Sequence, residues 1–183
     1  RGLVTLDALK WIGLATVVIQ TALALSLSPV LMLPLAATWA YLYLMHNEFF
    51  VGEWLNKHPL LYMLSHMGIL FFTDLFITAC HWLVSGMEPS ATLLFFFATS
   101  FKLGMVIEIG RKIKAPVDEI AGANTYSRTW GLKTATFAWL YTLVSSGVFA
   151  VITASKVGFG IQALAIISIM FILCSITAFR FLN

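Results

Sequence analysis

Residues 157–181 read VGFGIQALAIISIMFILCSITAFRF, and this stretch decides the fold. It holds a single charged residue, Arg180, near its end. A transmembrane helix needs roughly 20 mainly apolar residues, whereas a helix on the surface of a soluble protein carries a polar face. The stretch is long enough and apolar enough to predict a helix that crosses a membrane.

Five more apolar runs precede it, over residues 9–27, 30–46, 59–85, 90–109 and 133–153. The chain of 183 residues is 60% hydrophobic and 10% charged. Soluble domains are about 45–50% apolar and about 25% charged, so a soluble protein is excluded. We predict an all-α, polytopic transmembrane helical bundle of about six transmembrane helices. Residues 1–183 are expected to form a single transmembrane domain without a soluble domain.

The connections between the runs differ in length and polarity. Turns at Ser28–Pro29, at 85–90 and at 154–158 are short, so each should join two helices into a hairpin. Residues 46–58 and 111–132 form two longer polar loops. If the N-terminus of this chain is cytoplasmic, both polar loops are cytoplasmic as well.

The basic residues favour this orientation, because cytoplasmic loops carry an excess of Lys and Arg. Only Lys156 would then lie outside. The cytoplasmic set would be Arg1, Lys10, Lys57, Arg111, Lys112, Lys114, Arg128, Lys133 and Arg180.

Two charged residues, Asp74 and Lys102, lie inside the predicted helices. They stand at similar distances on either side of the turn near Met87 and Glu88, so antiparallel helices would bring them to similar depth. A charge inside a bilayer is costly unless it is paired or hydrated. We therefore expect Asp74 and Lys102 to pair or to share a polar cavity. They would either fix the helix register as a buried ion pair or line a substrate cavity.

The segment 108–131 holds the densest charges in the chain. Mg²⁺ commonly binds one or two carboxylates together with substrate phosphates, and Arg and Lys bind phosphate oxygens. The segment could therefore form a diphosphate site at the membrane surface. On the charges alone, an ordinary solvated loop is the better interpretation. Its three carboxylates and four basic residues are Glu108, Asp118, Glu119, Arg111, Lys112, Lys114 and Arg128.

The first polar loop mixes charges with aromatic residues, which is typical of a short helix at the membrane interface. Its polar residues, Asn47, Glu48, Glu53 and Lys57, would cap the same face as the second loop. A role as interfacial anchor is the simpler interpretation, and it is favoured by Phe49, Phe50 and Trp54.

The segment 108–131 resembles the second polar motif of the UbiA superfamily of intramembrane prenyltransferases. That motif has an acidic cluster, then Gly-x-x-Thr, then a Gly several residues on. Gly122, Thr125 and Gly131 match its tail. Asp118 precedes Gly122 by four residues, as the last aspartate of the family motif does, and Glu108 matches the first acidic position.

Two stretches extend the resemblance. Residues 108–119 follow the pattern Glu-x-Gly-Arg-Lys-x-x-x-Pro-x-Asp-Glu of a divergent, mostly bacterial branch, and residues 1–6 look like the basic segment after the family's first aspartate motif. The family fold has nine transmembrane helices. The chain would therefore be a fragment of helices three to eight and would lack the first acidic motif. Arg111 stands where many members carry a middle aspartate, which would weaken binding of one metal ion or replace it by direct phosphate pairing.

The resemblance implies a Mg²⁺-dependent enzyme that transfers an isoprenyl group from a prenyl diphosphate to a hydrophobic or aromatic acceptor. It places the protein among membrane lipids, in a bacterial inner membrane. The implied metal ligands are Glu108, Asp118 and Glu119, of which Glu108 and Asp118 would be catalytic. The residues implied at the diphosphate are Arg111, Lys112, Lys114, Tyr126 and Arg128.

The main alternative is a non-catalytic UbiA-like subunit with a structural or a lipid- or pigment-organising role in a larger membrane complex. The substitution at Arg111 favours it. A CDP-alcohol phosphotransferase would need an Asp-Gly…Ala-Arg…Asp motif, which the sequence lacks. A transporter would be expected to show internal repeats, and the two halves show none. No nucleic-acid partner is expected.

Overall fold

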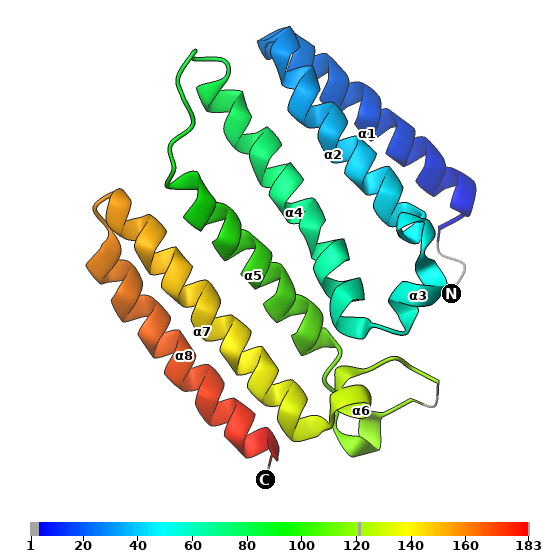
Figure 1. Ribbon diagram of the computed structural model, residues 1–183, viewed down its shortest axis with the longest axis vertical. Helices are drawn as coiled ribbons and strands as arrows, with labels where there is room; N and C mark the ends of the chain where they lie inside the picture. Colours follow the sequence, from blue (N-terminus) through cyan, green and yellow to red (C-terminus); the bar gives the residue numbers. More distant parts are fainter. Residues whose placement is uncertain (1–3, 121, 183) are drawn as a thin grey trace.

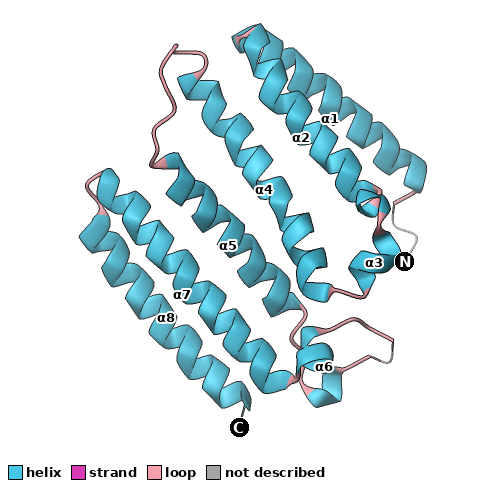
Figure 2. Cartoon of the chain, in the orientation of Figure 1, coloured by secondary structure: helices cyan, strands magenta, loops and turns pink. Residues whose placement is uncertain are grey.

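The computed structural model describes residues 4–120 and 122–182, and every regular element in that part is a helix (Figure 2). Arg1 and the first half of the segment 1–6 lie outside the described residues. The prediction of an all-α chain with six long helices is confirmed. The long helices are α1 (Leu6–Leu27), α2 (Met32–His46), α4 (Pro59–Trp82), α5 (Leu93–Arg111), α7 (Leu132–Lys156) and α8 (Gly160–Leu182). The short elements are η1 (Pro29–Leu31), η2 (Glu48–Phe50), α3 (Gly52–Asn56), η3 (Pro116–Asp118) and α6 (Tyr126–Trp130).

All six long helices, with η1 included in the second span, are long enough and apolar enough to cross a membrane. Many of their large apolar side chains face outward: Leu6 is 77% exposed, Leu33 72% and Ile161 84%. Apolar exposure along whole helices suits lipid rather than water as the surrounding solvent. The chain therefore has the architecture of a multi-pass membrane protein.

The long helices form a row in the order α1, α2, α4, α5, α7, α8, and each packs against its neighbours in the chain (Figure 1). The most extensive packing joins α5 to α7 and α7 to α8. Within the described residues, no extensive contact joins the first helix of the row to the last. The expected bundle is thus open.

The elements α3 and α6 and both described chain ends lie at the same end of the long helices, which we call the loop end (Figure 1). The two polar loops therefore share one face, as predicted. Lys156, at the last position of α7, lies at the opposite end.

The boundaries of α4 and α5 differ from the predicted runs 59–85 and 90–109. After Trp82 the chain closes a Schellman turn, in which the amide of Met87 donates to the carbonyl of Trp82 (2.9 Å) and that of Gly86 to Leu83 (3.4 Å). Gly86 supplies the positive φ (66°) that this turn needs. The α5 helix begins only at Leu93, because the polar residues before it form turns instead.

The predicted ion pair between Asp74 and Lys102 is not formed. Asp74 is buried on α4, and its Oδ2 atom has no hydrogen-bond partner. Lys102 on α5 places its Nζ atom 5.5 Å from the ring centre of Tyr141 on α7. None of the ion pairs between described residues includes Asp74 or Lys102. Spacing about a turn constrains depth but not rotation about the helix axis, and Lys102 is turned towards α7.

Candidate functional site

The last turn of α5 holds a carboxylate between two cations. Glu108 is only 8% exposed, because it faces the packed interior of the row. Its Oε2 atom lies 2.5 Å from Nε of Arg111, and its Oε1 atom lies 2.7 Å from Nζ of Lys112. These spacings of three and four residues bring side chains together on one face of a helix. Glu108 was predicted as a metal ligand and Arg111 and Lys112 as ligands of a diphosphate, and the structure brings the three side chains together as ion pairs.

Tyr126 fixes the short helix α6 against this cluster. Its amide donates to the carbonyl of Lys112 (2.9 Å), and its ring stacks on Trp130 at 4.3 Å. The ring is 4% exposed and packs with Met63, Ile109 and Ala135. Burial and the nearby charge of Glu108 raise the pKa of Tyr126 to about 12.

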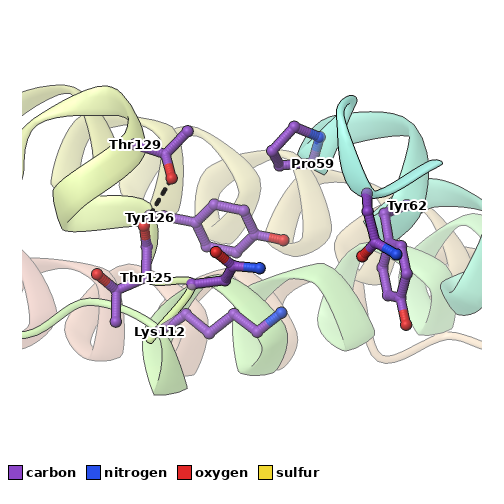
Figure 3. A pocket seen from close by; sticks show the side chains of 8 residues that line it. Pro59, Tyr62, Lys112, Thr125, Tyr126 and Thr129 are labelled. Atoms are coloured by element: carbon purple, nitrogen blue, oxygen red, sulfur yellow. Dashed lines mark hydrogen bonds between the residues drawn. The ribbon is translucent and has the colours of Figure 1, made fainter. Parts of the chain in front are cut away.

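A small pocket opens beside Tyr126, between the start of α4, the end of α5 and α6. Figure 3 shows Lys112 and Tyr126 on one side and Tyr62 across from them. The Nζ atom of Lys112 lies 5.4 Å from the ring centre of Tyr126. The volume is about 50 Å³, which holds one or two water molecules. A larger anion must therefore displace side chains to enter. The lining residues are Asn56, Pro59, Tyr62, Lys112, Asn124, Thr125, Tyr126 and Thr129.

Glu119 stabilises the loop that leads into α6. Its carboxylate accepts hydrogen bonds from the hydroxyls of Ser127 (2.5 Å) and Thr125 (2.8 Å to each oxygen). These bonds hold the pKa of Glu119 below its ordinary value, and the more distant charges of Arg128 and Lys114 lower it further. The Oγ1 atom of Thr125 also caps α6 by accepting from the amide of Arg128 (3.3 Å). The carboxylate therefore braces the start of α6.

The glycines of the Gly-x-x-Thr…Gly pattern occupy backbone positions that favour glycine. Gly122 and Gly131 both have a φ of 83°. Gly122 lies in the turn before α6, and Gly131 separates α6 from α7. Together with the cap formed by Thr125, the pattern explains the shape of this loop.

Lys114 and Arg128 belong to a different hollow from Lys112. This second hollow has a volume of about 520 Å³ and shares no lining residue with the small pocket. Thr125, the cap of α6, and residues 126 and 129 of α6 line the small pocket, whereas residues 127 and 128 line the second hollow. Of the five residues predicted at one diphosphate, Lys112 and Tyr126 line the small pocket, Lys114 and Arg128 line the second hollow, and Arg111 lines neither. The second hollow is lined by Lys114, Pro116, Glu119, Ile120, Ser127, Arg128 and Leu132.

The three predicted metal ligands do not converge. Asp118 is exposed on η3, and no hydrogen bond or ion pair of the described residues involves its carboxylate. Glu119 is engaged by two hydroxyls and Glu108 by two cations. Across residues 4–120 and 122–182, no group of three or more His, Cys, Asp and Glu residues could hold a metal ion. The acids present do not fit a cation site built by this chain's described residues alone.

Sequence reasoning missed Tyr62 of α4, which contacts the first polar loop. The hydroxyl of Tyr62, one turn into α4, lies 3.5 Å from Oε1 of Glu48, and its ring stacks on His66 at 4.1 Å. The helix start at Pro59 was the available signal that Tyr62 lies near the loop end. A short helix, α3, is present where an interfacial helix was predicted, and Trp54 on it is 51% exposed.

The same loop contains a strained turn. Glu48, Phe49 and Phe50 have φ values of 48°, 53° and 60°, a left-handed conformation that side chains disfavour. Contacts of Phe49 with Tyr41 and of Phe50 with Tyr43 hold this turn against α2. The strain lies next to Tyr62 and hence next to the small pocket.

No family model, no curated protein and no solved structure matches this chain.

Proposed function

We propose that this chain is a UbiA-like membrane prenyltransferase that binds a prenyl diphosphate at the loop end and transfers the isoprenyl group to a hydrophobic or aromatic acceptor. The observation that supports this function best is the pair of cations, Arg111 and Lys112, which Glu108 holds at the loop end of α5. Lys112 also lines the small pocket. Such a cluster presents donors to phosphate oxygens while the apolar chain stays among the helices.

In the proposed reaction, the bond between the allylic carbon and the diphosphate oxygen breaks, and the electron pair leaves with the diphosphate. The acceptor supplies the electrons of the new carbon bond and loses a proton to water. Lys112 and Arg111 would stabilise the charge that develops on the leaving diphosphate. The hydroxyls of Tyr126 and Tyr62 would donate hydrogen bonds from opposite sides of the pocket.

Mg²⁺ is the cation that the proposed reaction requires. A single protein carboxylate would be enough if the ion arrives with the diphosphate, because Mg²⁺ keeps several waters and binds substrate phosphates. Glu108 is joined to the pocket through Lys112 and would be that carboxylate. Asp118 lines neither hollow, and Glu119 accepts hydrogen bonds from Thr125 and Ser127.

The proposed location is a bacterial inner membrane with the loop end in the cytoplasm. Lys10, near the start of α1, and Arg180, near the end of α8, join the basic residues of the two loops at this end. The opposite end has Lys156. This distribution is the one that the positive-inside rule predicts.

Binding of geranyl diphosphate to the full chain in detergent tests the proposal. We expect saturable binding that is stronger with Mg²⁺ than with a chelator and much stronger than binding of geraniol. Lys112→Ala should weaken it about tenfold or more, since a hydrogen bond to a charged group contributes about 1.5–3 kcal/mol. Lys156→Ala, at the opposite end, is the matched control. Unchanged affinity in Lys112→Ala would show that the site is elsewhere.

A non-catalytic role in a larger membrane complex is the second candidate. It is favoured by an apolar groove of about 590 Å³ along α5, α7 and α8, which could hold a lipid or pigment. The groove is lined by Leu103, Val144, Gly147 and Phe171, among other residues. Two results together would favour this second function. The chain would fail to bind geranyl diphosphate, and it would retain an apolar ligand that the Gly147→Leu substitution displaces.

A further inference from the structure

The hollow of about 520 Å³ on the outer face of α6 combines cations with apolar walls. Lys114 comes from the segment after α5 and Arg128 from α6, and the amide of Lys114 donates to Oγ of Ser127 (3.0 Å). This bond ties the two sides of the hollow together. The rest of the wall includes Pro116, Ile120 and Leu132, so the hollow is amphipathic.

The charge in this hollow is not balanced. None of the ion pairs between described residues includes Lys114 or Arg128. Glu119 also lines the hollow, but its oxygens accept hydrogen bonds from Thr125 and Ser127. The wall therefore presents two cations against one carboxylate. An anionic group is the ligand that this arrangement would attract.

The start of α7 adds to the attraction. Leu132, its first residue, lines the hollow, and Gly131 before it offers no side chain to cap the helix. The first amides of α7 thus have no side-chain acceptor at the cap, and the helix dipole places partial positive charge there. A phosphate oxygen is a suitable acceptor for such amides.

Two exposed apolar side chains belong to the same segment as Lys114: Ile120 lines the hollow, and Val117 follows Pro116 of its wall. Val117 is 91% exposed and Ile120 is 72% exposed. Both belong to the segment between α5 and α6, at the loop end. Exposed apolar residues next to Lys and Arg are typical of segments that enter the boundary between headgroups and acyl chains.

We propose that this hollow binds the phosphate of an anionic phospholipid from the leaflet at the loop end. Lys114 and Arg128 bind the phosphate oxygens, and Val117 and Ile120 insert beside the acyl chains. Lipid phosphates lie at this level of the membrane at high local concentration, and anionic lipids attract basic side chains. The site is distinct from the small pocket at Lys112, and it does not depend on the proposed transferase function.

Native mass spectrometry of the detergent-purified full chain, incubated with equal amounts of phosphatidylglycerol and phosphatidylcholine, tests the proposal. The wild type should retain phosphatidylglycerol preferentially. Lys114→Ala with Arg128→Ala should reduce this preference about tenfold, while Lys114→Arg with Arg128→Lys should keep it. Lys57→Ala with Lys156→Ala removes the same charge elsewhere and should leave the preference unchanged.

Three outcomes would overturn the proposal. One is wild-type retention of phosphatidylglycerol by the Lys114→Ala, Arg128→Ala variant. A second is an equal loss in the Lys57→Ala, Lys156→Ala control, which would indicate general electrostatic attraction. The third is displacement of phosphatidylglycerol by geranyl diphosphate or inorganic phosphate, which would assign the hollow to a soluble or substrate phosphate. A thermal unfolding curve for each variant ensures that every comparison is made on folded protein.

Discussion

The ammonium group of Lys112 lies 2.7 Å from the Oε1 atom of Glu108, one helical turn earlier on α5. Glu108 also accepts from Arg111, so the charge of one buried carboxylate is shared by two cations. An incoming anion must compete with this carboxylate for the same donors. In the proposed function, the balance between Glu108 and the diphosphate would decide how strongly the pocket binds it.

Replacing Glu108 by Gln should release Lys112 and Arg111 for the anion. We expect Glu108→Gln to bind geranyl diphosphate several-fold more tightly than the wild type in the presence of a chelator, because the competing charge is gone. The same variant should lose most of the gain in affinity that Mg²⁺ provides. Isothermal titration with and without Mg²⁺ measures both effects. Weaker binding in the chelator would contradict the role given to Glu108.

Thr125→Ala should loosen α6. The substitution removes both the helix cap on Arg128 and a hydrogen bond to Glu119. Loss of an N-cap typically costs about 1 kcal/mol, so the amides of residues 126–130 should exchange their hydrogens several-fold faster. Thr125→Ser keeps the hydroxyl and serves as the control. Equal exchange in Thr125→Ala and the wild type would show that the cap is unimportant.

Alkaline pH should release Tyr126 from its packed position. The pKa of Tyr126 is raised from 10.0 to about 12, so the folded state holds the proton more tightly than the unfolded state. The stability from this difference is complete below pH 10.0 and is lost as the pH rises through about 12. Tyrosinate absorbance should show a step near pH 12 that disappears in Tyr126→Phe. A Tyr126→Phe variant with an unchanged titration curve would assign the late step to another tyrosine.

Gly68→Ala should disturb the packing of α2 on α4. A Cβ atom at position 68 would lie 2.1 Å from the hydroxyl of Tyr41 and 2.8 Å from its Cζ atom. Tyr41 would lose its hydrogen bond to the carbonyl of Ser65 (2.6 Å) and its stacking on Phe72 (4.6 Å). Overpacking of this kind costs about 1–3 kcal/mol and should lower the melting temperature in detergent.

Gly13→Ala provides the matched control for that substitution. A Cβ atom at position 13, in α1, would meet no atom within 4 Å. The melting temperature of Gly13→Ala should therefore equal or exceed that of the wild type. If Gly68→Ala and Gly13→Ala lowered the melting temperature equally, the close approach of Tyr41 to position 68 would not be the cause.

The six long helices could be predicted because a span across a bilayer requires a long apolar run, and nothing else in the chain resembles one. The cluster of Glu108, Arg111 and Lys112 was likewise accessible, since residues three and four apart meet on any helix. Both the helices and this contact depend on local sequence spacing and need no knowledge of how helices pack.

The features that could not be predicted depend on rotation and on short helices. Residues 126–130 were expected within a loop, so the faces of α6 and the division of Lys114 from Lys112 were not foreseen. Lys102 was expected beside Asp74, but the rotation of α5 turns it towards Tyr141. The contact of Tyr62 with Glu48 depends on a left-handed turn of three non-glycine residues, Glu48–Phe50, which no local preference would suggest.

The row-like order of the long helices bears on how the protein is made. Each long helix after α1 packs against the long helix synthesised just before it, so a newly inserted span meets a neighbour that is already in place. Contacts between distant parts of the chain are few, and assembly can proceed from the first span to the last without waiting for the C-terminus. A ribosome paused after α5 should thus leave α1, α2, α4 and α5 already docked in the bilayer.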